Sequence, residues 1–145
     1  MTEPKRSYSI FDHTADIGIE MTAPSLPALY ETAAFALFDL MAEPVAGDPA
    51  APDLQHEVRV TAADPEELLV RWLAELLYLY DAKGVVLSRF EVVELSPESL
   101  RARVEGSYLT SRRHRIKTEI KAVTYHQVSV VRSGASWKGR VILDV

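Results

Sequence analysis

The spacing of apolar residues changes at Gly84, and this change restricts the chain to folds that combine helices with a run of strands. Two long stretches before it carry the three-to-four-residue spacing of helices, whereas after it apolar residues recur at every second position, as in strands. Helices and strands grouped in this way are typical of α+β domains, in which helices cover antiparallel strands. The sequence therefore predicts an α+β fold with a largely antiparallel β-sheet and two main α-helices.

Both predicted helices have clear signals at their ends. The first covers Ser25–Glu43, with the serine as N-cap, and ends before Pro44, which cannot continue a helix. The second begins after Asp64, a capping residue followed by a proline and two acids that suit the positive end of the helix dipole. It is expected to end near Lys83, because Gly84 suits the position just past a helix.

Strands are predicted wherever apolar and polar residues alternate. They cover Tyr8–Phe11, Ile17–Met21, Leu54–Ala62, Val85–Leu87, Phe90–Leu95, Leu100–Tyr108, Ile116–Tyr125, Gln127–Arg132 and Trp137–Leu143. A polar turn is expected over Asp12–Asp16 and a rigid, proline-rich surface loop over Pro44–Asp53. A chain of 145 residues is the usual size of one domain, so we expect a single domain over residues 1–145.

Composition excludes several classes of protein. The chain has no cysteine, which removes disulfides, thiolate zinc sites and cysteine nucleophiles. Its net charge of -5 argues against a protein that binds nucleic acid by charge alone. The glycines form neither a dinucleotide fingerprint nor a phosphate loop. No apolar run reaches the roughly 18 residues of a membrane span and no secretion signal is seen, so we expect a cytoplasmic protein without a membrane.

The first candidate site is the turn between the first two strands. Asp12, His13 and Asp16 place three groups that can bind a cation or exchange a proton within five residues. Turns also use aspartate and threonine for local hydrogen bonds to the backbone. Spacing alone therefore leaves a capped turn and a functional site both open.

The second candidate lies in the later strands. Alternation places Lys121 on the same side of a strand as Glu119 and Tyr125, and His126 follows Tyr125 in the sequence. A solvated face of a sheet has the same pattern. The residues alone do not separate the two interpretations.

The third candidate is the C-terminus. A strand pattern runs from Trp137 almost to the last residue, so Asp144 and the terminal carboxylate of Val145 would be held in place and would favour a cation. A free, solvated chain end is the alternative. The basic run Arg112–Arg115 likewise fits either a phosphate contact or a solvated loop.

Four segments, in order along the chain, resemble motifs of the archease family. They are His13-Thr14-Ala15-Asp16-Ile17-Gly18-Ile19, Trp72-Leu73-Ala74-Glu75-Leu76-Leu77-Tyr78-Leu79-Tyr80-Asp81, Lys121-Ala122-Val123-Thr124-Tyr125-His126 and Leu143-Asp144-Val145. The resemblance covers essentially the whole chain. It implies a small protein cofactor of the GTP-dependent RNA-splicing ligase RtcB, which joins RNA ends in tRNA splicing. Members of this family assist guanylylation of the ligase and permit multiple turnover, and they meet tRNA only through the ligase.

The resemblance also implies a metal site. By motif position, Asp16, Asp144 and the main chain or terminal carboxylate of Val145 would hold a divalent metal. Oxygen ligands of this kind suit calcium first, with magnesium or manganese as alternatives. Three further side chains are expected to contact the partner or assist the site: Lys121, His13 and His126.

Two other functions remain open at this point. One is a stand-alone, metal-dependent phosphohydrolase with His13 as its base. The other is a chaperone-like modulator of a tRNA methyltransferase, a role also suggested for the family. A hydrolase needs phosphate-binding groups of its own, and the chain has little positive charge near its candidate acids. We therefore expect a protein cofactor and not an enzyme.

Overall fold

The computed structural model describes residues 7–13, 16–45 and 52–145 and confirms the predicted α+β class. The helices are α1 (Leu26–Met41) and α2 (Pro65–Lys83). The strands are β1 (Tyr8–His13), β2 (Asp16–Ala23), β3 (Ala42–Pro44), β4 (Leu54–Thr61), β5 (Val85–Ser96), β6 (Ser99–Tyr108), β7 (His114–Ile116), β8 (Ala122–Ser133) and β9 (Ser136–Asp144). All of the strand pairings are antiparallel, as the sequence predicts.

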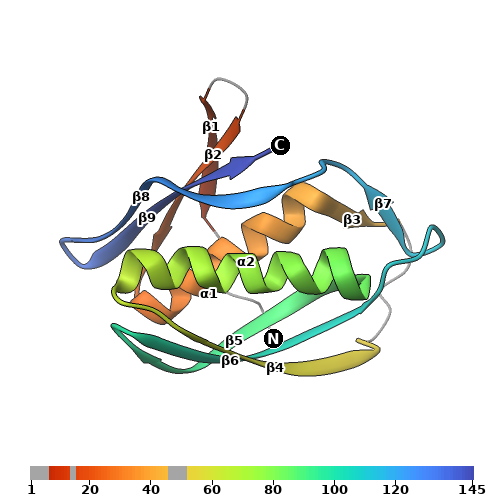
Figure 1. The fold of residues 1–145 in the computed structure, drawn as a ribbon, viewed down its shortest axis with the longest axis horizontal. Helices are drawn as coiled ribbons and strands as arrows, with labels where there is room; N and C mark the ends of the chain where they lie inside the picture. Colours follow the sequence, from red (N-terminus) through yellow and green to blue (C-terminus); the bar gives the residue numbers. More distant parts are fainter. Residues whose placement is uncertain (1–6, 14–15, 46–51) are drawn as a thin grey trace.

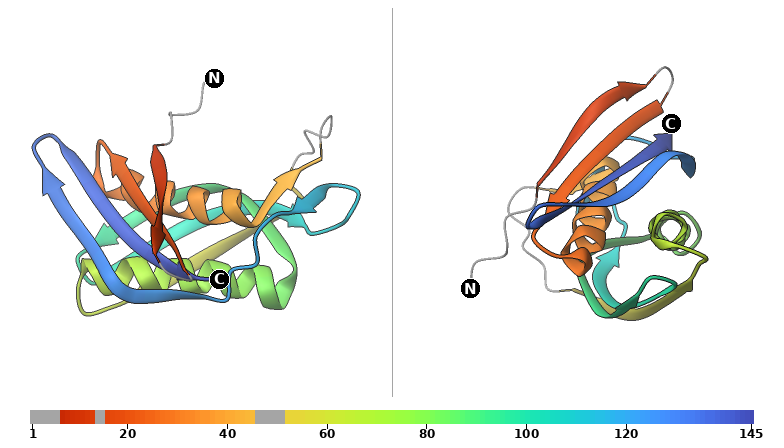
Figure 2. Two further views of the ribbon diagram at one scale, coloured as in Figure 1. Left: turned by 90° about the horizontal axis from the view of Figure 1, so that it is seen from above. Right: turned by 90° about the vertical axis from the view of Figure 1, so that its left-hand side faces the viewer.

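The strands form three sheets. A four-stranded sheet has the order β1-β2-β9-β8, a three-stranded sheet the order β4-β6-β5, and β3 pairs with β7. Both helices lie between the two larger sheets and contact each of them (Figures 1 and 2). Each large sheet therefore has one face toward the helices and one face away from them. Neither helix is long and apolar enough to cross a membrane, as judged over the described residues.

The start of α1 and both ends of α2 are confirmed, and hydrogen bonds explain them. The Asp64 carboxylate accepts the N–H of Glu67 at 2.8 Å, and the Glu67 carboxylate accepts the N–H of Ala63 at 2.8 Å. This reciprocal pair satisfies two donors that have no partner inside the helix. At the other end Gly84 has a φ of 66°, a left-handed conformation that suits glycine. Ser25 caps α1 in the same way, accepting an N–H three residues on.

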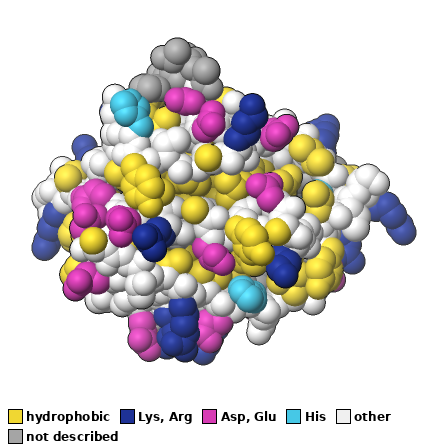
Figure 3. Space-filling model, in the orientation of Figure 1, with side chains coloured by type: hydrophobic (Ala, Val, Ile, Leu, Met, Phe, Trp, Pro, Cys, Tyr) yellow, Lys and Arg dark blue, Asp and Glu magenta, His cyan; other side chains and the backbone are white. Residues whose placement is uncertain are grey.

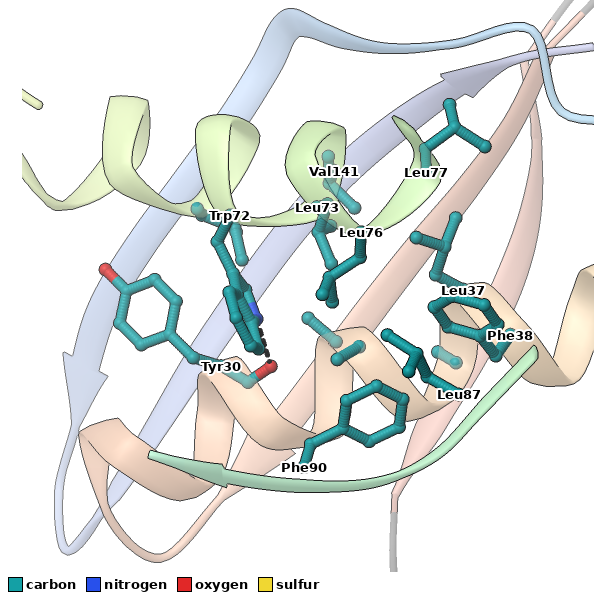
Figure 4. Packing of buried hydrophobic residues seen from close by; sticks show 14 of the residues in the cluster. Tyr30, Leu37, Phe38, Trp72, Leu73, Leu76, Leu77, Leu87, Phe90 and Val141 are labelled. Carbon is teal, nitrogen blue, oxygen red and sulfur yellow. Dashed lines mark hydrogen bonds between the residues drawn. The ribbon is translucent and has the colours of Figure 1, made fainter. Parts of the chain in front are cut away.

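A single tryptophan connects the two helices through the core. Trp72 and Tyr30 are both completely buried, and the indole N–H of Trp72 donates to the carbonyl oxygen of Tyr30 at 2.9 Å (Figure 4). Leucines of α2 and aromatic residues of α1 and β5 surround this contact (Figure 4). A buried indole that has a hydrogen-bond partner fixes the orientation of the helices as well as filling space.

The first helix is shorter than predicted. It ends at Met41, and the predicted helical residues Ala42 and Glu43 belong to β3, which also includes the first residue of the predicted loop. The residue before a proline is disfavoured in the helical region, so Pro44 forces the preceding backbone into an extended conformation. This short strand then pairs with β7, which was not predicted separately. Residues 46–51 of the predicted loop lie outside the described part of the chain.

The predicted strand Ile116–Tyr125 is wrong in its first half. It divides into the end of β7, an irregular connection over 117–121 and the start of β8. Glu119 and Lys121 are therefore not on a strand, and the predicted face shared with Tyr125 does not exist. Two backbone bonds explain the irregular path, because Lys117 and Thr118 donate to carbonyl oxygens at the end of α1.

Other strands are longer than predicted. The expected turn over Asp12–Asp16 is narrower, since β1 extends through His13 and β2 begins at Asp16. The two predicted strands at 85–95 are one strand, β5, with irregular pairing near Ser88 and Val93. Likewise β8 continues through His126, which was predicted to separate two strands. Bulges of this kind interrupt the alternation of side chains without ending a strand.

Gly106 lies where a side chain has no space, and this gives a first test of the fold. A Cβ atom at this position of β6 would lie 2.1 Å from the backbone oxygen of Val86 on β5. We expect Gly106→Ala to reduce the free energy of unfolding by about 2–3 kcal/mol. The thermal midpoint should fall by roughly 5–10 °C in circular dichroism. Ser107→Ala, at the next position, adds no atom and should stay within about 1 kcal/mol of wild type; equal stability of both variants would contradict the β5–β6 register.

Candidate functional site

The register between β2 and β9 places Asp16 directly opposite Asp144. Three residues further along, Ile19 lies opposite Val141, and both are completely buried in the core beside the helices. Successive side chains of a strand point to opposite faces. The two aspartates are therefore on the face of the four-stranded sheet that points away from the helices, which we call the outer face (Figure 2).

The two aspartates form a pair of like charges at the end of the sheet. Directly opposite residues of an antiparallel pair have Cβ atoms about 4.5–5.5 Å apart, so the carboxylates of Asp16 and Asp144 repel one another. Both residues are only partly exposed. A divalent cation between them removes this repulsion, and carboxylate oxygens are hard ligands that suit calcium or magnesium. The fold thus brings together two predicted site residues that are 128 positions apart.

The predicted residues Lys121 and Val145 lie beside the pair. The backbone N–H of Lys121 donates to the carbonyl oxygen of Asp144 at 2.8 Å, and its side chain is exposed. Val145 follows Asp144 directly and packs partly against the core, so the chain end is held by apolar contact. Both residues are thus near the aspartate pair, although Lys121 reaches it from an irregular segment and not from a strand.

The two predicted histidines lie on either side of this edge. His13, the last residue of β1, is paired with Asp16, and its side chain is outside the described part of the structure. His126 is exposed in β8, and its backbone N–H donates to the hydroxyl of Thr124 at 3.3 Å. The four-stranded sheet therefore brings His13 next to the pair and leaves His126 further along the neighbouring strand.

A cation at this edge needs more ligands than the two aspartates. Calcium takes about six to eight oxygen atoms, and two carboxylates supply four at most. Within the described residues no cluster of three or more Asp, Glu, His or Cys side chains is found that could hold a metal. Main-chain carbonyls, the terminal carboxylate of Val145 or water would complete the shell. The chemistry of these residues fits a cation such as calcium, because the carboxylates supply the negative charge that balances it.

The outer face has a small cluster of its own, which the sequence analysis missed. Phe11 of β1 lies across Gly18 of β2, where a Cβ would be 2.1 Å from the ring. The guanidinium of Arg140 lies 4.6 Å from the centre of the same ring. Ile142 of β9 pairs with Gly18, and it is completely buried although its side chain faces away from the core. An isolated glycine within a strand was the available signal for such a close approach.

Arg140 connects three strands of this face. It forms an ion pair with Glu20 on β2, donates to the side-chain oxygen of Gln127 on β8 at 3.2 Å and stacks over Phe11 on β1. A planar guanidinium can make such hydrogen bonds and a ring contact at once. The outer face is therefore ordered by side chains and is not merely solvated.

The basic run is largely engaged with acids. Arg113 forms an ion pair with Asp53, and Arg115 forms one with Glu43. Exposed pairs of this kind contribute little to stability, but they neutralise two of the three arginines. This favours the solvated-loop interpretation of Arg112–Arg115.

A separate cavity of about 200 Å³ opens between α1, β3 and β5. Phe35, Phe38 and Phe90 give it an apolar floor, and Asp39 and Arg113 are among the polar residues at its edge. The sequence analysis did not predict it, because its walls come from segments that are distant in the chain and that only the fold brings together. None of the residues predicted for the metal site or its accessory side chains lines it, whereas Arg113 of the basic run does.

The repulsion in the aspartate pair can be measured directly. Asp144→Asn removes one charge and keeps the shape of the side chain, so in chelator and low salt the free energy of unfolding should rise by about 0.5 kcal/mol. The gain should shrink in high salt, which screens the repulsion. Thermal unfolding of Glu98→Gln, an exposed acid in the β5–β6 turn of the other large sheet, is the control. A clear loss of stability in Asp144→Asn would show that this carboxylate makes a stabilising contact instead.

Comparison with known proteins shows similarity to the archeases. The model described as archease protein family (MTH1598/TM1083) matches residues 8–145. The protein archease of Methanosarcina mazei is 35% identical over 151 residues, which cover 100% of both chains. The protein archease of Pyrococcus abyssi is 34% identical over 139 residues, covering 93% of this chain and 96% of the relative.

Two solved structures are also similar. The solution structure of Methanobacterium thermoautotrophicum protein 1598 has a TM-score of 0.78 and 30% identity, covering 95% of this chain and 98% of that one. The crystal structure of an archease from Thermotoga maritima, described as a possible chaperone, has a TM-score of 0.64 and covers 100% of this chain and 98% of that one. At 24% identity, this second likeness concerns the fold alone.

Proposed function

The chain belongs to the archease family, and from this we propose that it activates the GTP-dependent RNA-splicing ligase RtcB through a divalent metal held by Asp16, Asp144 and Val145. It would promote guanylylation of the ligase and multiple turnover in tRNA splicing and RNA repair, and it would act as a cofactor protein of the ligase and not as an enzyme. Calcium is the first candidate for the metal, with magnesium or manganese as alternatives.

One observation carries this proposal. Asp16 and Asp144, which come from opposite ends of the chain, lie directly opposite one another in the β2–β9 ladder. Opposite positions of neighbouring strands bring the two carboxylates close enough to share one ion. Carboxylate oxygens are ligands that calcium prefers, so a cation would turn this pair into a binding site.

The side chains suggest what the site does. The two carboxylates hold the metal, which supplies positive charge for a phosphate group or a carboxylate of the ligase. The backbone of Lys121 is bonded to Asp144, and from there its exposed side chain can approach the same anion. The outer-face residues keep β1, β2 and β9 aligned under this edge. Chemistry on GTP and RNA then stays with the ligase.

A second candidate function is a chaperone-like modulator of a tRNA methyltransferase. The family resemblance suggests it, and the Thermotoga maritima archease is described as a possible chaperone. This function predicts binding to the methyltransferase or its tRNA that does not depend on Asp144. The two proposals are therefore separated by the response to a single substitution.

The activator function is tested in a multiple-turnover RNA ligation assay. Substoichiometric amounts of the wild-type protein should increase product formed by the cognate ligase, while the protein alone should neither ligate RNA nor hydrolyse GTP. Asp16→Ala and Asp144→Ala should each reduce stimulation by at least about tenfold, the loss expected when a metal site is damaged. Glu98→Ala, an exposed acid in the β5–β6 turn, is the matched control and should stimulate normally.

Folding must be checked beside activity. Calcium should raise the thermal midpoint of the wild type and of Glu98→Ala, and should leave both aspartate variants unchanged. Full stimulation by a well-folded Asp16→Ala, Asp144→Ala double variant would contradict the metal-site mechanism. No stimulation by the wild type of a ligase that is competent in single turnover would contradict the activator function itself.

A further inference from the structure

One segment of β8 departs from its partner strand close to the aspartate pair. Thr124 pairs with Ile142 and Ser129 pairs with Arg140, so four residues of β8 lie opposite a single residue of β9. We call this segment, Tyr125–Val128, the β8 bulge. Bulges re-aim side chains and are frequent beside functional sites.

The backbone of the β8 bulge is strained. Gln127 has a φ of 54°, and no other non-glycine residue in the described part of the chain has a positive φ. A residue other than glycine rarely adopts the left-handed backbone region, so the surrounding structure must hold Gln127 there. Such strained positions cluster at binding sites and switch regions. The β8 bulge is therefore a conformation that the protein maintains at a cost.

Side chains of the outer face hold the β8 bulge from one side. The amide oxygen of Gln127 accepts a hydrogen bond from Arg140 at 3.2 Å. Arg140 is itself fixed by its ion pair with Glu20 and by the ring of Phe11. The left-handed residue is thus connected to β1 and β2 through one guanidinium group.

Thr124 holds the β8 bulge from its other end. Its hydroxyl donates to the carbonyl oxygen of Ile142 at 2.9 Å and accepts the N–H of His126 at 3.3 Å. One side chain thus bonds both to the neighbouring strand and to the segment that leaves it. The position of Tyr125, between Thr124 and His126, is determined by these bonds.

The held segment carries an exposed aromatic residue. Tyr125 is 55% exposed, although tyrosine usually buries its ring where the fold permits. It follows Thr124, which is two residues along β8 from Ala122, the partner of Asp144. Exposed tyrosines in ordered segments are typical anchors of protein interfaces, because the ring offers a large contact area at a small loss of entropy.

The charges nearby favour a protein partner over RNA. Asp16, Asp144 and Glu20 are on the outer face, Gln127 of the β8 bulge is bonded to Arg140 on that face, and the chain has a net charge of -5. On the side of the molecule drawn in Figure 3, lysines and arginines are interspersed with acids and do not form a continuous basic surface. RNA binding needs several unopposed cations along its phosphates. An aromatic anchor beside acids fits an apolar pocket with a basic edge on another protein.

We propose that the β8 bulge is the surface through which this protein docks on its ligase, with the ring of Tyr125 inserted into an apolar pocket of that enzyme beside the Asp16–Asp144 edge. This inference rests on the proposed function and assigns its contact surface. Arg140 is a positioning residue, since it acts through Gln127 and touches the partner only indirectly. The carboxylates and the anchor then meet one surface of the ligase together.

The test compares two tyrosines of equal exposure. Tyr125→Ala should weaken binding to the purified ligase at least tenfold in isothermal titration calorimetry, because it removes the anchor. Tyr108→Ala is the control, since Tyr108 is 56% exposed at the end of β6 in the other large sheet. It should bind the ligase within twofold of wild type. Calcium titration of isolated Tyr125→Ala should match wild type, which separates docking from metal binding.

A labelling experiment covers the case in which Tyr125→Ala does not fold. The chain has no cysteine, so Tyr125→Cys and Tyr108→Cys each accept a single environment-sensitive dye. Addition of ligase should shift the emission of the dye at position 125 and leave the dye at position 108 unchanged. Shifts of equal size, or none at position 125, would overturn the proposed surface.

The remaining outcomes are equally decisive. Wild-type affinity of a folded Tyr125→Ala overturns the docking surface but leaves the activator function in place. A wild-type protein that does not bind the ligase at all removes the activator function and this surface with it. If the wild type binds tRNA alone, and Tyr125→Ala weakens that binding but not ligase binding, the surface belongs to RNA and the proposal is wrong.

Discussion

The antiparallel register between β2 and β9 is the constraint on which the rest of the candidate site depends. On the side of the helices, Ile19 lies opposite Val141 and Met21 lies opposite Gly139. This side has no space for a larger residue at Gly139, because a Cβ there would lie 2.9 Å from the end of the Met21 side chain. A shift of one residue would turn all of these side chains outward. The buried face therefore fixes the register, and the register in turn places Asp16 opposite Asp144.

The outer face shows how the same sheet serves two purposes. The inner face of the four-stranded sheet is part of the core. The outer face carries the aspartate pair, the ring of Phe11 over Gly18 and the guanidinium of Arg140. Most antiparallel sheets leave such a face to water. Here a completely buried Ile142 and a maintained bulge give it a defined shape, as recognition surfaces require. Order on this face is therefore an argument for binding that is independent of the charges.

Much of the fold could be predicted from the sequence, because the signals are local. Asp64 and Gly84 mark helix ends by their own backbone preferences, and the alternation of apolar residues identified most strands. The three-residue strands β3 and β7 could not be predicted, since they are too short to alternate and exist through their pairing. Lys121 was placed on a strand because alternation continues through an irregular segment that α1 holds by backbone bonds.

Some residues of the candidate site could likewise be predicted from the sequence, and others could not. Family motifs pointed to Asp16 and Asp144, but only the fold brings them together, and no spacing in the chain carries that information. Phe11, Arg140 and the left-handed Gln127 gave no recognisable signal, because their roles depend on neighbours from three different strands. Gly18 was the one available indication, as a glycine inside an otherwise regular strand.

The central claim is that Asp16 and Asp144 act as one cation site. Calcium titration of the wild type, Asp16→Asn, Asp144→Asn and the double variant by calorimetry forms a double-mutant cycle that tests it directly. If the two carboxylates share one ion, each single substitution should remove nearly all of the binding that the double variant removes. Independent, additive losses, or calcium binding that persists in the double variant, would contradict it.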